Sequence, residues 1–280
     1  SESFVTRVDY NLSAQVSKTS DEHYDLISNP DGVITDVREP GLHEAMFKTK
    51  SYHSEYRIDG LPVNVYAQLV ANKYMGLGGS SHTTFKLGAE YTYDANKGDG
   101  LIFDRANPPQ SMGAQTLRPR AFKDIPALHT LSGFFSDKLS LALGTTRADI
   151  EAGVRVSNLF LNADKSGGNN GMFVAEPRVN ASVSLLNKRN NSLLDDLSLT
   201  GGFGISNKMP TLLYLYPDNV YYDNVSLAKY GDAEKDRLAL VKTDVISNTT
   251  NPDLRPAHSR KWEAGLSFRL GQVSGFVTYF

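Results

Sequence analysis

Several features that commonly decide a fold are missing from this sequence. It has no cysteine, so disulfide bonds and thiolate metal sites are excluded. It also has no apolar run of about 18 residues, the length that a transmembrane helix needs. An excess of charge is lacking too, because 29 Lys and Arg against 31 Asp and Glu give a formal net charge of -2. This balance implies no attraction to nucleic acid, and the chain could cross a membrane only as a closed β-sheet.

The motifs of catalytic and metal sites are missing as well. The six histidines are scattered and show no spacing such as His-Glu-x-x-His, and neither a Gly-x-Ser-x-Gly elbow nor a P-loop occurs. Segment 94–100 superficially resembles a calcium loop, but Asp99 occupies the place of the required glycine and no Glu stands at position twelve. The sequence therefore predicts a protein that is not an enzyme and that has no metal and no cofactor.

Long alternation of apolar and polar residues is what the sequence does contain. In segment 177–186, Val179, Ala181, Val183 and Leu185 share one face, and polar side chains occupy the other. Strands of globular proteins average about 5 to 6 residues, whereas a strand that crosses a bilayer at a tilt needs about 9 to 11. The length therefore favours an all-β, antiparallel transmembrane β-barrel. About nine such strands are expected, at 4–16, 63–71, 85–93, 128–143, 150–156, 177–186, 197–206, 261–270 and after Gly271.

The connections between these strands alternate between long and short. The long ones are 18–61, 94–127, 161–176 and 207–257. The short ones are 74–81, 144–147, 187–196 and the single residue Gly271. This alternation is typical of outer-membrane barrels, which have short periplasmic turns and long extracellular loops. It also predicts that 47–58 is not a separate spanning strand. Since closed bacterial barrels have an even strand number, residues 1–280 are expected to form one partial barrel domain.

Several motifs resemble the barrel of TonB-dependent outer-membrane receptors. The resemblance covers the chain from residue 127 onward most firmly and the first half more loosely. The motifs are Phe134 to Leu143 with Gly153-Val154-Arg155, Glu176-Pro177-Arg178, Gly202-Phe203-Gly204 before Lys208-Met209-Pro210-Thr211-Leu212, and Asn251-Pro252-Asp253-Leu254-Arg255-Pro256 before Trp262-Glu263-Ala264-Gly265-Leu266.

The resemblance implies a receptor in the bacterial outer membrane. Members of this family have a 22-stranded barrel occluded by an N-terminal plug, and they import a nutrient such as a siderophore, vitamin, glycan or peptide. The implied partners are the TonB complex, outer-membrane lipid, a surface lipoprotein and the nutrient. The plug and the TonB box are not found in this chain, which is therefore interpreted as a piece of barrel wall. The alternative is a soluble or surface-displayed β-rich module that binds carbohydrate or protein.

The longest connection holds the candidate ligand-binding residues. Tyrosine rings beside carboxylates can stack on a sugar or peptide plane while they accept hydrogen bonds. The second interpretation, that the tyrosines pack the loop against its neighbours or lie at the membrane rim, is the preferred one. The candidates are Tyr214, Tyr216, Asp218, Tyr221, Tyr222 and Asp223.

Overall fold

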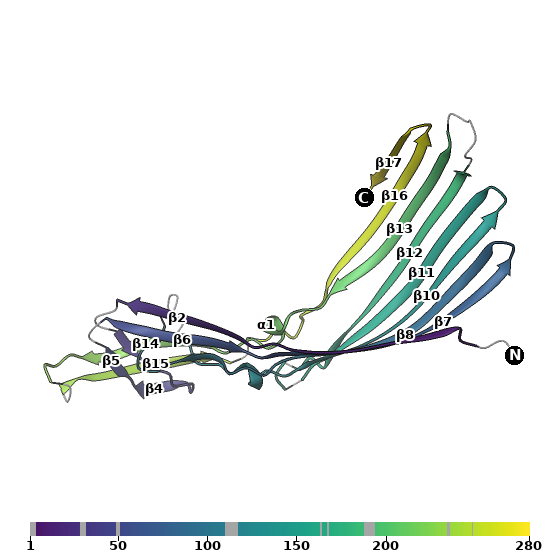
Figure 1. The fold of residues 1–280 in the computed structure, drawn as a ribbon. Coiled ribbons are helices and arrows are strands. Elements are labelled where there is room, and N and C mark those ends of the chain that lie inside the picture. The colour runs from purple at the N-terminus through teal and green to yellow at the C-terminus, as the bar shows by residue number, and fades with distance from the viewer. Residues whose placement is uncertain are drawn as a thin grey trace.

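A computed structural model describes residues 4–28, 32–48, 51–109, 117–162, 164–166, 168–187, 194–233, 236–247 and 249–280. Its main element is one nine-stranded antiparallel sheet, in the order β1-β7-β8-β10-β11-β12-β13-β16-β17 (Figure 1). These nine strands are the ones that the alternation predicts. Their bounds are β1 Arg7–Val16, β7 Pro62–Gly78, β8 Ser81–Asn96, β10 Leu128–Leu143, β11 Thr146–Phe160, β12 Gly171–Asn187, β13 Asp196–Lys208, β16 Ala257–Leu270 and β17 Val273–Tyr279.

One face of this sheet, here called the apolar face, is uncovered. Cross-strand register places large apolar side chains beside one another on it, as in the pairs Phe135 with Val154 and Phe203 with Trp262. All four of these side chains are exposed. Such a face is too extensive for an ordinary soluble surface. Other exposed members of the apolar face are Leu69, Leu87, Leu131, Val179, Leu199 and Leu266.

The opposite face, here called the polar face, carries a hydrogen-bonded network. Gln68 Nε2 donates to Glu90 Oε1 at 2.8 Å, and Arg155 forms an ion pair with the same carboxylate. Arg155 also donates to Ser132 Oγ at 3.3 Å, and the Ser132 and Ser157 hydroxyls are 2.8 Å apart. Because each polar group finds a partner on a neighbouring strand, the network fixes the register of four strands.

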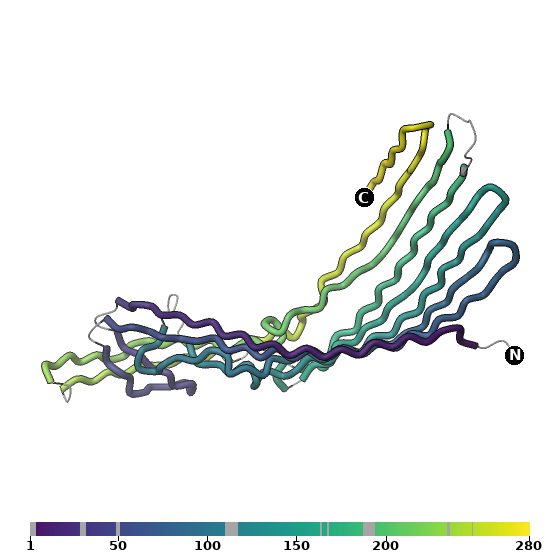
Figure 2. The backbone as a smooth tube through the Cα atoms, in the orientation of Figure 1, coloured from purple at the N-terminus to yellow at the C-terminus, as the bar shows by residue number. Residues whose placement is uncertain are grey.

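The short turns lie at one end of the sheet and the long connections at the other (Figure 2). Gly144 and Gly271 each open a two-residue turn with φ of 67° and 60°, a conformation that favours glycine. The bounds of three predicted short connections were wrong. The connection predicted at 144–147 is only residues 144–145, because β11 begins at Thr146. The turn at Gly271 includes Gln272, and β7 continues to Gly78, so only two residues connect it to β8. A hairpin turn pairs its flanking residues, which extends the strands beyond the alternating core. Within the short connection 187–196, residues 188–193 lie outside the described part.

The long connections are richer in strands than the sequence indicated. Strand β2 (Thr19–Ile27) follows β1, β6 (Tyr52–Gly60) precedes β7, and β9 (Gly100–Phe103) follows β8; the three form a small sheet. This sheet continues the wall, since the pair of Thr19 with Gly60 follows directly on the pair of Val16 with Val63. Segment 47–58 therefore contributes β6 outside the nine-stranded sheet, which confirms the prediction that it is not a separate spanning strand.

The segment predicted as the long connection 94–127 was expected to be loop, and this was wrong in two places. Strand β8 runs to Asn96, and β9 pairs with β6, from Asp59 opposite Gly100 to Tyr56 opposite Phe103. The prolines of the segment lie outside these strands, as expected for residues without a backbone donor. A short 3-10 helix, η1 (Phe122–Asp124), precedes β10.

A second three-stranded sheet, β14-β15-β4, projects from the loop end. Strands β14 (Val220–Lys229) and β15 (Leu238–Ile246) form a hairpin within the longest connection, and β4 (Gly41–Glu44) adds to it from the connection between β1 and β7. A two-stranded sheet of β3 (Gly32–Ile34) and β5 (Met46–Lys48) completes this region. Strands from different loops thus pair with one another.

Candidate ligand-binding site at the loop end of the sheet

The longest connection begins by folding back over the polar face. After β13, Thr211 precedes the single-turn helix α1 (Leu212–Leu215). Leu215 and Tyr216 pack against Leu159 of β11 and Met172 of β12, and together these four residues form a buried hydrophobic cluster. Because Leu159 lies on the same face as Arg155, the helix covers the polar face at the loop end of the sheet.

Tyr216 anchors this arrangement. Its side chain is only 3% exposed, and its Oη accepts a hydrogen bond from the Asn162 backbone N–H at 2.9 Å. Its carbonyl oxygen accepts a hydrogen bond from Arg120 Nη2 at 2.7 Å. The connections between β8 and β10, β11 and β12, and β13 and β16 therefore meet at one tyrosine.

A buried arginine joins the remaining long connection. Arg118 donates from Nη2 to both carboxylate oxygens of Asp223 at 3.0 Å, and also to the Val37 carbonyl oxygen at 3.0 Å. Its guanidinium carbon lies 4.6 Å from the centre of the Tyr221 ring. The Asp223 carboxylate also accepts a hydrogen bond from the Thr243 hydroxyl at 2.8 Å. Loss of one partner from a buried, hydrogen-bonded ion pair leaves an uncompensated charge, so this cluster locks three loops together.

An open cavity of about 710 Å³ lies beside these contacts. Three polar contacts involve residues that line the cavity. Arg120 lies opposite Asp218 with a nitrogen–oxygen distance of 3.9 Å, and Lys165 Nζ donates to the Asp124 carbonyl oxygen at 3.2 Å. Asp99 forms an ion pair with Lys123 at 2.7 Å. Charges of both signs therefore surround the cavity. Its lining includes Arg38, Asp99, Arg120, Asp124, Asp164, Lys165, Tyr216, Asp218, Asn219, Ser247 and Thr249.

The ionised form of Asp99 is favoured at this edge. The hydrogen bond from Lys123 and the charge of that ammonium group lower the pKa of the Asp99 carboxyl, against a smaller effect of burial. The same hydrogen bond and charge raise the pKa of Lys123. Both groups thus keep their charges over a wider pH range than they would alone.

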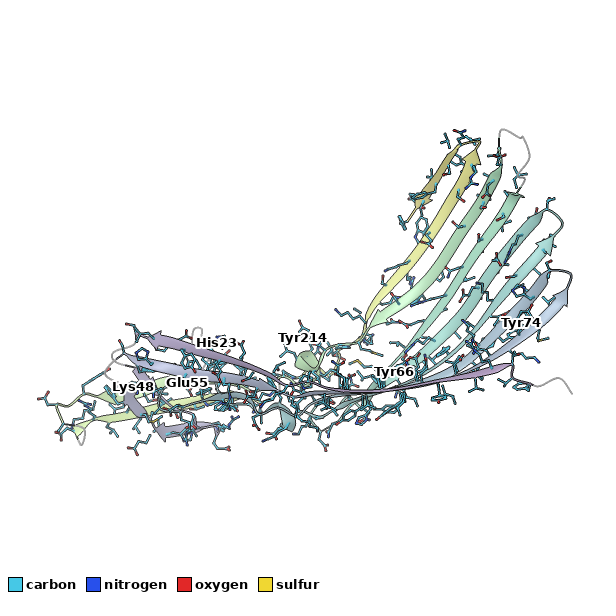
Figure 3. All side chains as sticks on the ribbon, viewed as in Figure 1. His23, Lys48, Glu55, Tyr66, Tyr74 and Tyr214 are labelled. Atoms are coloured by element: carbon cyan, nitrogen blue, oxygen red, sulfur yellow. The ribbon has the colours of Figure 1, made fainter. Side chains whose placement is uncertain are left out.

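The structure does not bring the six predicted ligand-binding residues into one site. Tyr216 and Asp218 line the cavity, whereas Tyr214 on α1 is 65% exposed (Figure 3). Tyr221 and Asp223 lie in the Arg118 cluster, where Tyr221 is 3% exposed. Tyr222 follows on β14 and is half-buried.

Two arginines at the centre of this region were missed. Arg118 and Arg120 flank Pro119 in a connection that looked irregular. The sequence feature that could have pointed to them is a pair of cations on either side of a proline, in a loop rich in polar residues. Nothing in the sequence indicated that one of them would be buried and the other would line a cavity, because their partners lie about a hundred positions away, at residues 216–223.

Comparison with known proteins adds a family assignment to this geometry. The sequence model of one family, described as TonB dependent receptor-like, beta-barrel, matches residues 3–280. The chain belongs to this family. No curated protein and no solved structure matches it. The open nine-stranded sheet is therefore a part of a TonB-dependent receptor barrel, and the family is one of outer-membrane transport receptors.

The described residues contain neither a cluster of metal ligands nor a membrane-spanning helix. Within the described ranges, no group of three or more His, Asp or Glu side chains could hold a metal ion. Segment 94–100 belongs to the end of β8 and the start of β9. None of the helices in the described part of this receptor chain is long and apolar enough to span a membrane.

Proposed function

We propose that this chain forms part of the barrel wall of a receptor that resides in the bacterial outer membrane and imports a nutrient with energy from the TonB complex. The observation that carries the proposal is the nine-stranded sheet with one uncovered apolar face and with its short turns at a single end. A face of this kind is stable where lipid covers it. Membership of the receptor family supports the same placement.

The cavity between the loops is proposed as the place where the nutrient first binds. Its mixed charges suit a polar ligand that carries both donors and acceptors, within the siderophore, vitamin, glycan and peptide classes. Arg120 is the cation best placed for this role, because it is held at the cavity by the Tyr216 carbonyl oxygen.

The full-length receptor gene provides the test of location and transport. Cells that express it should retain the protein in urea-washed outer membranes, and its electrophoretic mobility should change on boiling. A deletion strain should lose growth on one nutrient from a panel of ferric siderophores, cobalamin, oligosaccharides and peptides, and a strain without TonB should lose growth on the same nutrient. Recovery of the protein in the soluble fraction would instead support a β-rich binding module.

A pair of matched variants tests the cavity. Arg120→Gln should weaken binding of that nutrient about tenfold or more, since it removes a charged donor from the ligand side. Arg57→Gln is the control, because Arg57 pairs with Asp59 at 2.7 Å on β6 and does not line the cavity. Equal nutrient affinity of the two variants would place the ligand elsewhere.

A further inference from the structure

Strands β12 and β13 separate near the loop end of the sheet and leave a notch. Pairing between them begins at Arg178 with Gly204, whereas β13 remains paired with β16 as far as Lys208 with Ala257. Segment 171–177 of β12 therefore pairs with β11 but not with β13. Figure 1 shows β13 and β16 turning away from β12 toward α1. A groove of about 750 Å³ lies at this place, between segments 168–175 and 252–258.

The side chains of the apolar face change character at the notch. Along β16, Trp262 is followed toward the loop end by Arg260 and then His258. Along β13, Ile205 is followed by Asn207, and register pairs Ile205 with Arg260 and Asn207 with His258. The apolar band of this face thus ends at Trp262 on β16 and one step further toward the loops, at Ile205, on β13.

This level fits the outer boundary of a bilayer. Arg260 precedes Gly271, at the turn, by eleven positions, which is about 36 Å along an extended strand. At a strand tilt of about 40° this becomes about 28 Å along the membrane normal, against an apolar band of about 25 Å. Arg260 and His258 therefore lie where lipid headgroups replace acyl chains.

Hydrogen bonds cross the notch between β13 and β12 and orient its histidine. Arg260 Nε donates to His258 Nε2 at 3.3 Å, so this ring nitrogen carries no proton. His258 Nδ1 then donates to Asn207 Oδ1 at 3.0 Å, and Asn207 Nδ2 donates to the Ala175 carbonyl oxygen at 3.4 Å. The direction of these three hydrogen bonds is set by Arg260, because a guanidinium group can donate hydrogen bonds but cannot accept them.

Two guanidinium groups at the notch have unused donors. Among the described residues, the terminal Nη groups of Arg260 bind no partner, and Arg255, which lines the groove, binds none either. Asp253 is the single acidic side chain among the described lining residues. Phe173 lines the groove on the loop side of Arg260 and is 67% exposed. On the turn side of Arg260, the rings of Phe203 and Trp262 are exposed on the apolar face. A cationic pocket thus borders directly on an apolar surface.

We propose that this notch binds the phosphorylated headgroup of a lipid in the outer leaflet. Guanidinium groups bind phosphate through paired donors. Arg260 supplies one such group beside His258 of the groove, and Arg255 supplies a second from the groove lining on its loop side. The acyl chains of the same lipid would lie along the apolar face on the turn side of Arg260, beginning at Phe203 and Trp262. The proposal rests on the outer-membrane location proposed above.

The test uses the full-length receptor, purified in detergent and freed of lipid. Native mass spectrometry would follow titration with hexa-acyl lipid A that carries two phosphates, with the same lipid after removal of its phosphates, and with inorganic phosphate. The Arg255→Gln/Arg260→Gln variant should bind the phosphorylated lipid at least about tenfold more weakly than the unaltered receptor. The single variant Arg255→Gln, which leaves the His258 contacts intact, should show a smaller loss in the same direction.

Arg178→Gln is the matched control. Arg178 belongs to β12 but lies on the polar face, lines other hollows and does not line the groove, so its replacement should not change lipid binding. Mobility shifts on boiling would verify that each variant is folded. Equal binding of the dephosphorylated lipid, unchanged binding by the double variant, or full competition by inorganic phosphate at lipid concentrations would each overturn the proposal. Absence of the receptor from outer membranes would contradict the proposed location. If the receptor is found there but the double variant binds lipid as the unaltered receptor does, only the proposed lipid site would be contradicted.

Discussion

The main sheet and the loop region bury opposite kinds of side chain. In the sheet, large apolar side chains such as Leu87 and Phe203 are exposed, while Glu90 and Ser132 on the polar face are buried. In the loop region, strands from different connections pair with one another and enclose a charged pair, Arg118 with Asp223. The difference follows from the surroundings: a spanning wall meets lipid on one face, whereas the loops meet water and must form their own interior.

The largest effect is expected in the loop region. Arg118→Met leaves the Asp223 carboxylate buried without its cation, which should destabilise the packing of the loops by about 3 to 5 kcal/mol. Hydrogen exchange should show loss of protection in β14 and β15 and no change in β11. Arg57→Met, at a partly exposed ion pair, is the control. Unchanged protection in β14 would show that the cluster does not hold the loops.

An arginine on the apolar face should have the next largest effect. Leu266 precedes Gly271 by five positions, which places it about 13 Å from the short turns and near mid-depth. Leu266→Arg should lower the free energy of unfolding in lipid by about 2 to 4 kcal/mol. Ser267→Arg, whose side chain points to the polar face, should cost much less. Denaturant titration in lipid vesicles would measure both variants; complete loss of folding in Leu266→Arg would indicate a dry protein core instead of lipid.

A smaller effect is expected on the polar face at Gly88. The Phe134 ring lies across this glycine, and an added Cβ would approach the ring to 2.2 Å. Gly88→Ala should therefore displace the ring and cost about 1 to 3 kcal/mol. Gly76→Ala, at a site with no atom within 4 Å, is the control in the same pair of strands. Equal unfolding midpoints of the two variants would show that the ring moves aside freely.

The smallest effect is expected from the exposed pair of Asp99 and Lys123. The pKa of Asp99 is lowered, so its contribution to stability is present above the unfolded pKa of about 4 and is lost as the pH falls through the lowered value. The pKa of Lys123 is raised, so its contribution is lost as the pH rises through the raised value. Asp99→Asn should remove a weak stabilisation that is constant between about pH 5 and 9. Thermal unfolding of Asp99→Asn and the unaltered receptor across this range would measure it, and a difference that varies within the range would contradict the assignment.

The alternating segments were predictable because each spanning strand meets two different solvents. Val179, Ala181 and Val183 face one of them along their whole strand, so the pattern is visible without any knowledge of neighbours. The strands β9, β14 and β15 were missed because they lie between loops. Each of these strands contacts residues of other connections, so its two faces do not meet two uniform environments. The sequence of the strand therefore lacks a regular alternation of apolar and polar residues.

The candidate site divides in the same way. The sequence indicated a connection rich in tyrosine and aspartate, and it placed Asp218 and Tyr216 near one another. It could not indicate that Arg120 would reach the Tyr216 carbonyl oxygen, or that Tyr221 would lie under Arg118. Those contacts join loops far apart in the chain, and loop composition does not fix their path.

The sequence by itself determined the nine long strands, their order of long and short connections and their apolar and polar faces, because strand alternation and turn chemistry are local. The tertiary structure alone decided where the chain departs from that regular wall. Strand β13 separates from β12 beyond Gly204, and after Lys208 the chain folds over the polar face, where Leu215 and Tyr216 pack on Leu159 and Met172. The same departure produces the notch beside Arg260, because a strand that turns inward leaves its neighbour without a partner.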